Sequence, residues 1–365
     1  MTKITKVSAT LIAAATAGLA SGAAQAQSSV TLYGSVDFGV NYTSNIGGGH
    51  VVQAVSGNSE PDKWGLRGVE DLGGGLKAIF QLENGFTVTN GQGTNPGSMF
   101  NRKALISLSS NDYGTVTMGH GPSIASTWVN PLTSSVLADI YENYHPGNID
   151  ELTTSSKALN DNMVRYTTPS WRGLQAAAEI SLGNTTNFGY GRSTGYGVNY
   201  NSGPIRAAVT YEIEANRATS IGNSIGISSF QGVDGSTTYV ADKLSNLAAA
   251  FVYDLGRFSL HALYTNVRLE HGPDADTFQT YEAGTSFRPN PFNQMDVTAY
   301  TSTLDSYRWT QVSAVEQHFL SKSTSIYAAV AYQHATGGAK AVIYSNGPSS
   351  GANQFALYTG VHHSF

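Results

Sequence analysis

The sequence predicts an all-β protein, an antiparallel barrel of about sixteen strands that crosses a membrane. Three observations lead to this fold class. The chain of 365 residues is only 12% charged, and it is rich in glycine (40) and tyrosine (20). Apolar and polar residues alternate along unusually long segments. Tight turn signals alternate along the chain with longer polar stretches, which is typical of connections that lie on opposite sides of a membrane.

The first 26 residues are predicted to be a cleaved secretory signal. Lys3 and Lys6 precede an apolar run at residues 11–20, and residues 24–26 read Ala-Gln-Ala, a small-x-small cleavage pattern. Residues 27–365 then form a single barrel domain. The chain contains no cysteine, so this exported protein is expected to fold without disulfides.

Residues 30–42 (VTLYGSVDFGVNY) predict the first membrane-crossing strand. Val36, Phe38 and Val40 share one face, whereas Asp37 and Asn41 share the other. Such a strand is longer than the ~5–6 residues usual in soluble sheets, and its length suits a tilted transmembrane strand. Residues 63–86 predict a hairpin that turns at three consecutive glycines.

The last eleven residues, FALYTGVHHSF, alternate up to the terminal Phe365. Chain ends normally fray, so this strand needs a neighbour. In hydrocarbon every backbone N–H and C=O must be paired, so the sheet must close and the last strand must pair with the first. Lipid then covers the apolar face, and the polar face lines a water-filled lumen, because about sixteen strands leave a channel.

Soluble all-β folds explain the pattern less well. A β-sandwich gives no reason for regular alternation of short and long connections, and no repeat of about 20–50 residues indicates a solenoid. Several blocks instead resemble the general-diffusion porins of Gram-negative bacteria, of the β-proteobacterial type. These blocks are SSVTLYGSVDFGV, WGLRGVEDLGGGLKAIFQLENGF, FNRKALISLSSNDYGTVTMG, RYTTPSWRGLQAAAEISLG and the C-terminal aromatic residue.

The resemblance implies a transmembrane antiparallel sixteen-stranded β-barrel with short periplasmic turns, long extracellular loops and a third loop folded inward to narrow the pore. It also implies an outer-membrane homotrimer that lets small hydrophilic solutes and ions diffuse passively. Expected partners are outer-membrane lipid and lipopolysaccharide, periplasmic chaperones and the outer-membrane assembly machinery. Phe365 resembles the family's assembly signal.

The third loop is expected at about residues 121–160, the longest connection in the first half of the chain. Its acidic residues are Asp139, Glu142, Asp150 and Glu151. Family pores oppose loop carboxylates with basic residues on the wall, and the resulting field sets the ion preference. We expect Asp139 and Glu142 to supply these carboxylates, because they lie mid-loop beside aromatic residues. Solvated loop charges are the alternative.

The opposing bases are predicted in two ways. Strand parity alone places Lys63, Arg67, Lys77 and Arg165 on the lumen side. The resemblance selects Lys63, where the family usually has arginine, and Arg102. Strand parity does not decide whether Arg102 faces the lumen, because Arg102 shares its parity with the apolar residues that follow on the same strand. Lys103 therefore remains the alternative, and a bulge could change the register.

His120 is the remaining predicted constriction residue. The family commonly has arginine at the corresponding place, so the substitution removes a fixed positive charge. An imidazole titrates near neutral pH, and the hypothesis is therefore a pH-sensitive conductance. The sign of the ion selectivity stays open.

Other chemistry finds little support. The adjacent His362 and His363 point to opposite strand faces and make a poor metal pair, and the sequence shows no catalytic, cofactor-binding or metal motif. Nucleic-acid binding is not expected at a net charge of −5. We expect no enzyme. The alternatives are a substrate-specific channel for sugars or anions, and an adhesin or receptor that acts through its surface loops.

Overall fold

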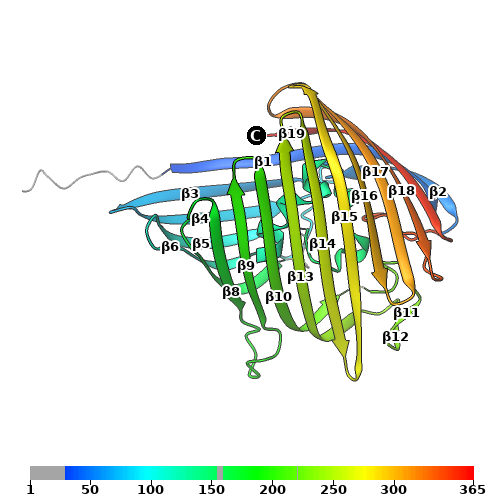
Figure 1. Cartoon of the computed structure of the whole chain (residues 1–365), viewed down its shortest axis with the longest axis horizontal. Coiled ribbons are helices and arrows are strands. Elements are labelled where there is room, and N and C mark those ends of the chain that lie inside the picture. The colour runs from blue at the N-terminus through cyan, green and yellow to red at the C-terminus, as the bar shows by residue number, and fades with distance from the viewer. Residues whose placement is uncertain (1–28, 154–158, 220) are drawn as a thin grey trace, which may run out of the picture.

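The computed structural model describes residues 29–153, 159–219 and 221–365 (Figure 1). The predicted secretory signal, residues 1–26, lies outside the described residues. Seventeen of the described strands form one antiparallel sheet, and β11 (Ser229–Phe230) and β12 (Val233–Asp234) form a separate ribbon. None of the described helices is long and apolar enough to cross a membrane.

The strands of the large sheet are short in the first half of the chain and longer in the second. The first group is β1 (Ser29–Ile46), β2 (Gly49–Ser56), β3 (Lys63–Gly73), β4 (Leu76–Gly85), β5 (Lys103–Ser110), β6 (Gly114–Pro122), β7 (Leu159–Thr167), β8 (Leu174–Ser181) and β9 (Ser193–Ser202). The second group is β10 (Ile205–Thr219), β13 (Tyr239–Leu255), β14 (Phe258–His271), β15 (Asp274–Asn290), β16 (Asn293–Leu304), β17 (Tyr307–Phe319), β18 (Thr324–Thr336) and β19 (Asn353–Ser364). Apart from the long β1, the first group has 8–11 residues per strand, whereas the second has 12–17.

The sheet closes on itself because β19 pairs with β1. The amide of Gly34 donates to the carbonyl of Phe365, and the amide of Phe365 donates back to Gly34, each at 3.0 Å. On its other edge β1 pairs first with β3 and then with β2, so these two strands occupy one position. The predicted sixteen-stranded barrel is therefore confirmed, with its terminal strand paired as membrane burial requires.

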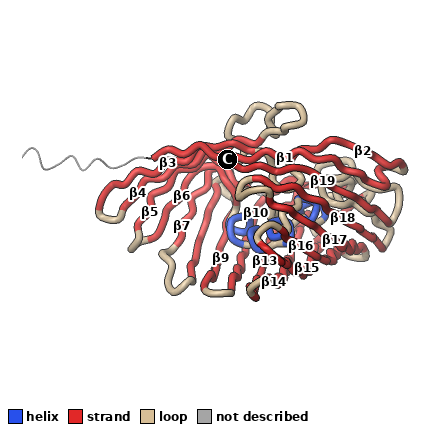
Figure 2. The backbone as a smooth tube through the Cα atoms, turned by 90° about the horizontal axis from the view of Figure 1, so that it is seen from above, coloured by secondary structure: helices blue, strands red, loops and turns tan. Residues whose placement is uncertain are grey.

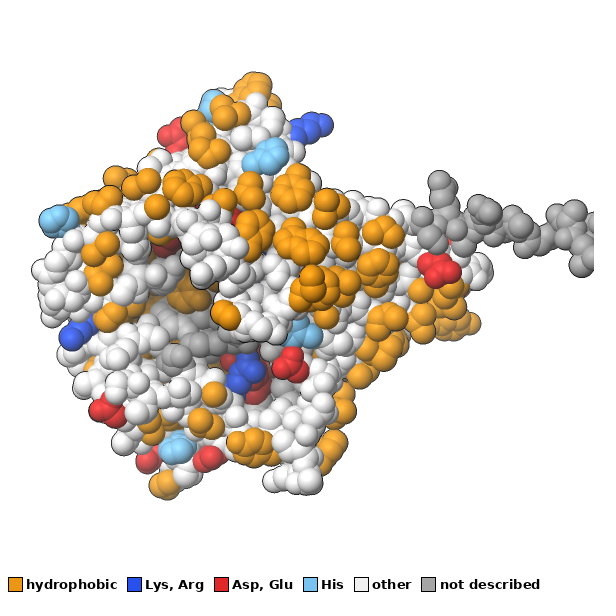
Figure 3. All heavy atoms as spheres, turned by 180° about the vertical axis from the view of Figure 1, so that it is seen from behind, with side chains coloured by type: hydrophobic (Ala, Val, Ile, Leu, Met, Phe, Trp, Pro, Cys, Tyr) orange, Lys and Arg blue, Asp and Glu red, His pale blue; other side chains and the backbone are white. Residues whose placement is uncertain are grey.

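The alternation read in the sequence places apolar side chains outside. On β1, Phe38 and Val40 remain 47% and 44% exposed, whereas Asp37 and Asn41 are buried inside the barrel. Exposed apolar side chains continue around the wall, and Figure 3 shows them spread along the strands of one face. Such an apolar outer band is what lipid contact requires.

Connections at one end of the barrel are short, as predicted. The β3–β4 turn uses Gly73, Gly74 and Gly75, all at positive φ, a conformation that glycine adopts without strain. At the opposite end the pattern is less regular than predicted, since β14–β15 and β16–β17 are joined by only two residues each. The long strands there continue pairing beyond the level at which the shorter wall ends.

The described part of the third loop, residues 123–153, folds into the barrel, as predicted. It contains α2 (Ile124–Trp128), α3 (Ser134–Leu137) and 3₁₀ turns at Asn130–Leu132, Tyr141–Asn143 and Pro146–Asn148. Figure 2 shows these helices enclosed by the strands. Most described side chains of the loop are buried, because the loop lies against the inner wall instead of in open solvent.

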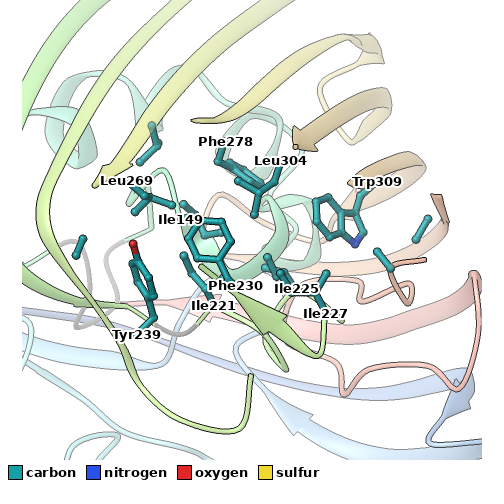
Figure 4. Packing of buried hydrophobic residues seen from close by; sticks show 14 of the residues in the cluster. Ile149, Ile221, Ile225, Ile227, Phe230, Tyr239, Leu269, Phe278, Leu304 and Trp309 are labelled. Carbon is teal, nitrogen blue, oxygen red and sulfur yellow. The ribbon is translucent and has the colours of Figure 1, made fainter. Parts of the chain in front are cut away.

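A second inward segment, residues 221–238, packs at the long-loop end. Ile225, Ile227 and Phe230 meet Ile149 of the third loop in an apolar cluster (Figure 4). The wall contributes apolar inward-facing residues to the same cluster, namely Tyr239, Val267, Leu269, Phe278, Leu304 and Trp309. The inner face of β13–β17 is therefore not polar throughout, in contrast to the prediction that parity alone made for the lumen.

Candidate functional site

Carboxylates on the wall hold the two helices of the third loop. Glu212 Oε1 on β10 accepts from the amide of Ala125 at 2.8 Å, and Glu282 Oε1 on β15 accepts from the amide of Ser134 at 2.8 Å. Both amides lie at helix N-termini, which leave unpaired donors and favour negative charge. Both carboxylates are buried, and these hydrogen bonds fix the loop to the β10–β15 side.

A buried histidine strengthens this attachment. His145 Nδ1 lies 2.5 Å from Asp150 Oδ2, and its Nε2 lies 3.2 Å from Glu282 Oε2. Burial lowers the pKa of His145, but the two carboxylates outweigh it and raise the pKa to about 10. Farther along, Glu151 of the loop pairs with Arg217 on β10 at 3.0 Å. Asp150 and Glu151 are thus anchors of the loop.

Arg165 holds the beginning of the loop. Its Nε lies 2.6 Å from Glu179 Oε2, and its Nη1 donates to Thr127 Oγ1 at 3.0 Å. The side chain faces inward, as parity predicts, but it contacts α2 and does not line the narrow passage described below.

The opposite side of the third loop faces a charged cavity of about 190 Å³. Its charged lining comprises three bases, Lys63, Arg102 and Lys103, and three acids, Glu60, Glu83 and Asp139. The bases and Glu83 come from β3–β5 and the loop before β5, Asp139 comes from the third loop, and Glu60 from the segment between β2 and β3. We call it the narrow cavity.

Each base of the narrow cavity has an acidic partner. Arg102 Nε lies 2.8 Å from Glu83 Oε1, and Lys103 Nζ lies 3.0 Å from Glu83 Oε2. Lys63 pairs with Glu60. The structure thus brings both alternatives, Arg102 and Lys103, to one carboxylate, because β5 begins at Lys103 and Arg102 reaches Glu83 from the preceding loop.

The two predicted loop acids occupy different places. Asp139 accepts from Ser59 Oγ at 2.5 Å and from Gln317 Nε2 at 2.8 Å, and it lines the narrow cavity. Glu142 is only 2% exposed and lines neither this cavity nor the wider one. Burial, with a smaller contribution from Asp37, raises the pKa of Glu142 well above its ordinary value. Asp139 is therefore the acid that faces the passage.

A wider cavity of about 530 Å³ adjoins the narrow one, and we call it the vestibule. Pro61, Arg102 and Tyr141 line both, so the two cavities are neighbours. Most of the vestibule lining is neutral and polar, including Asn41, Gln53, Asn95, Asn101 and Asn346. The neutral vestibule therefore lies next to the charged narrow cavity.

Arg67 and Lys77 follow the same wall toward the short-turn end. Register pairs Lys63 with Gly85, Arg67 with Gln81 and Asp71 with Lys77, so the three bases share the inward face. At ~3.4 Å per residue, Arg67 lies roughly 13 Å along β3 from Lys63. Within residues 29–153, 159–219 and 221–365, neither Arg67 nor Lys77 forms an ion pair.

His120 does not reach the passage. It pairs in register with Ala104 on the outward face, next to a bulge at Gly119, and its Nδ1 lies 2.6 Å from Asp161 Oδ1. The pH sensitivity expected from His120 at the constriction therefore has no basis in its position. His120 shares the parity of Val116 and Met118, which are exposed on the outer wall, so the alternation agrees with its position and the expectation from the resemblance does not.

Sequence reasoning missed Glu60 and Glu83. Glu83 shares its parity on β4 with Lys77, so the signal was present, but only bases were sought on this wall. Glu60 belongs to a short inward segment, residues 57–62, that interrupts the strand position shared by β2 and β3. Gly57 and Pro61 mark that interruption in the sequence.

Known proteins resemble the chain over almost its whole length. A family described as Gram-negative porin matches residues 9–338. An outer membrane porin protein of Bordetella pertussis is 30% identical over 78% of this chain and 79% of its own length. Outer membrane porin protein 32 of Delftia acidovorans is 27% identical over 95% and 97%. In fold, the chain resembles the anion-selective porin from Comamonas acidovorans, with a TM-score of 0.77 and 22% identity over 93% of this chain and all of that one.

Proposed function

The chain belongs to the Gram-negative porin family and is an integral β-barrel of the outer membrane, and from this premise we propose that it is a passive diffusion channel for small hydrophilic solutes and ions. The observation that carries the proposal is that the vestibule and the narrow cavity lie side by side within the barrel and share Pro61, Arg102 and Tyr141 in their linings. Solutes diffuse without energy input, and the third loop limits their size. No chemical step is required of the protein.

The charged residues of the constriction set the ion preference in this proposal. Lys63, Arg102 and Lys103 on one side oppose Asp139 on the third loop across the narrow cavity, whereas Glu60 and Glu83 offset the wall bases. Because the lining of the narrow cavity carries equal numbers of positive and negative side chains, it favours weak ion selectivity. Such a transverse arrangement aligns polar solutes while it leaves the net charge small.

Preference for anions is the second candidate, favoured by one observation. Arg67 faces the interior without an ion-pair partner among the described residues and lies opposite the neutral Gln81, whereas Lys77 lies opposite Asp71, so Arg67 is the base beyond the narrow cavity with no acid across from it on β4. The similar solved structure from Comamonas acidovorans is titled anion-selective, which is compatible with this candidate.

We also propose a homotrimer joined through the wall of β1–β5, where β2–β5 are short and the outward side chains apolar, among them Leu32, Phe80 and Ile106. Phe365, whose backbone closes the barrel against Gly34, is proposed as the signal that chaperones and the assembly machinery recognise. Outer-membrane lipid and lipopolysaccharide would then surround the remaining wall.

Single-channel recording of the refolded protein in planar bilayers tests this function. Under a KCl gradient we expect stepwise conductance, in groups of three for a trimer, with a small reversal potential. Its sign discriminates weak selectivity from the anion candidate. Membranes that stay silent, with folding verified by the heat-dependent gel shift of the barrel, would refute the channel.

A further inference from the structure

The structure turns His362 toward the lumen. On β19, His362 lies opposite Asp37 of β1 and Ser325 of β18, whose side chains are buried inside the barrel. Its Nε2 lies 3.3 Å from Glu60 Oε2, and its side chain is 12% exposed. The adjacent His363 lies opposite Val36 on the outward face, and its Nδ1 is 2.9 Å from Thr324 Oγ1.

Glu60 connects His362 with the narrow cavity. The carboxylate lines that cavity and is shared between Lys63, at Oε1, and His362, at Oε2. Burial raises the pKa of Glu60, but the hydrogen bond from His362 and the charge of Lys63 outweigh it and lower the pKa to about 2. Glu60 therefore remains ionised throughout the neutral and mildly acidic range.

The other elements packed around His362 contribute mainly negative charge. Asp139 of the third loop and Asp37 of β1 both lie close enough to act on the imidazole electrostatically. Asp62 contacts Asp37, because the amide of Asp37 donates to Asp62 Oδ1 at 2.5 Å. From β18, Tyr327 donates its hydroxyl to Asp37 Oδ1, and Ser364 of β19 is 3.4 Å from His362 Nε2.

We propose that protonation of His362 controls the ion preference of the constriction, so that the channel admits anions better at mildly acidic pH than at alkaline pH. The inference rests on the proposed channel function. Three bases and three acids balance in the lining of the narrow cavity. Protonation of His362 therefore adds one positive charge next to Glu60 and changes this balance, in the pH range in which an imidazole titrates.

Four other histidines, on the wall or beside the third loop, are placed differently in the described parts of the chain. His120 and His363 lie on outward faces of the wall. His145 and His261 are buried against Glu282, on the side to which the third loop is fixed. None of them lies beside a residue that lines the narrow cavity in the way that His362 lies beside Glu60.

The test is the reversal potential of the full mature protein under a KCl gradient, from about pH 8 to about pH 5. The wild type is expected to shift toward chloride by a twofold or larger change in the permeability ratio as the pH falls. His362→Asn should abolish this shift, and His362→Lys should hold the acidic value at all pH values. His363→Asn is the matched control on the same strand and should behave as the wild type.

Each other outcome has a defined meaning. A conducting channel whose wild-type reversal potential does not change with pH overturns the inference but leaves the channel function intact. Silent membranes overturn the channel function instead. A full pH response in His362→Asn also overturns the inference. If the response persists in His362→Asn but is lost in Asp37→Asn, the pH response belongs to the Asp37 carboxyl.

A second variant covers the case in which His362→Asn does not fold. Glu60→Gln retains the imidazole but removes the carboxylate that favours its protonation. The midpoint of the shift is then expected at lower pH than in the wild type. A midpoint that does not move contradicts the proposal.

Discussion

The two halves of the barrel interior are built from the same alternating strands, yet they differ in chemistry. In the filled half, the third loop and residues 221–238 cover β10 and β13–β17, and the inward side chains are apolar residues such as Phe278 and Trp309 or buried carboxylates such as Glu282. In the open half, β3–β5 carry Lys63, Glu83 and Lys103 in the lining of the narrow cavity, and Arg67 farther along the inward face of β3.

The difference shows that an inward position does not by itself mean contact with water. Where a loop removes the wall from solvent, apolar packing becomes favourable, and a charge persists only with a partner. Where the wall stays hydrated, charge is tolerated and becomes available for selectivity. Mutations in the filled half should therefore change stability first, and mutations in the open half should change ion preference first.

The largest effect is expected for Glu282→Gln. Glu282 accepts from the amide and hydroxyl of Ser134 and faces His145, so the change removes one charge of a fully buried network. Breaking such a network costs roughly 3–5 kcal/mol. The third loop should loosen, which a lower urea midpoint and faster proteolysis within residues 123–153 would report. Glu316→Gln, on the exposed outer face of β17, is the matched control, and equal midpoints for the two variants would contradict the anchoring role.

Trp309→Ala should come next. The fully buried indole packs near Phe278 and donates from Nε1 to the carbonyl of Lys340 at 3.2 Å. Truncation in a packed core costs about 3 kcal/mol, and it should release residues 337–352 and raise the conductance. Thermal unfolding and single-channel recording measure both effects. Trp171→Ala, at an exposed turn, should cost less than about 1 kcal/mol, and a similar loss in both variants would argue against a packed filled half.

Alkaline pH should remove the part of the stability of the filled half that depends on the charge of His145. The pKa of His145 is raised from an ordinary 6.5 to about 10, so its contribution is complete below about pH 6.5 and is lost as the pH rises toward 10. The urea midpoint of the wild type should therefore fall over this range. His145→Gln should be less stable than the wild type at neutral pH and converge with it near pH 10. A constant difference between the two proteins would show that His145 acts without its charge.

The smallest effect on stability is expected for Arg67→Gln in the open half. The side chain is exposed and unpaired among the described residues, so the free energy of unfolding should stay within about 0.5 kcal/mol of the wild type. The reversal potential should shift toward cations by roughly twofold in the permeability ratio, because one charge in water acts weakly. Lys322→Gln, in the β17–β18 turn, is the control. An equal shift of the reversal potential in this variant would contradict a role of the inner wall in ion preference.

Much of the fold could be predicted from the sequence. Alternation located the strands, hydrocarbon burial required closure, and the longest connection in the first half of the chain became the inward loop. For the site, parity was sufficient to direct Lys63 and Arg67 inward. For His120 the resemblance was misleading, since His120 shares the parity of the exposed Val116 and Met118 and lies on the outward face.

Residues that meet across the barrel could not be predicted. Glu60, Lys63 and His362 come from the 57–62 segment, β3 and β19, and only the closing register of β1 with both β3 and β19 brings them together. Likewise, Glu282 reaches the third loop across 148 residues of sequence. Local pattern carries no information about such distances.

By itself the sequence determined which face of each strand meets lipid, because burial of apolar side chains and pairing of every backbone group are local requirements. The tertiary structure alone decided which inward side chains stay in water, since that depends on where the third loop and residues 221–238 lie against the wall. The filled half and the open half therefore differ through packing that no alternation along one strand encodes.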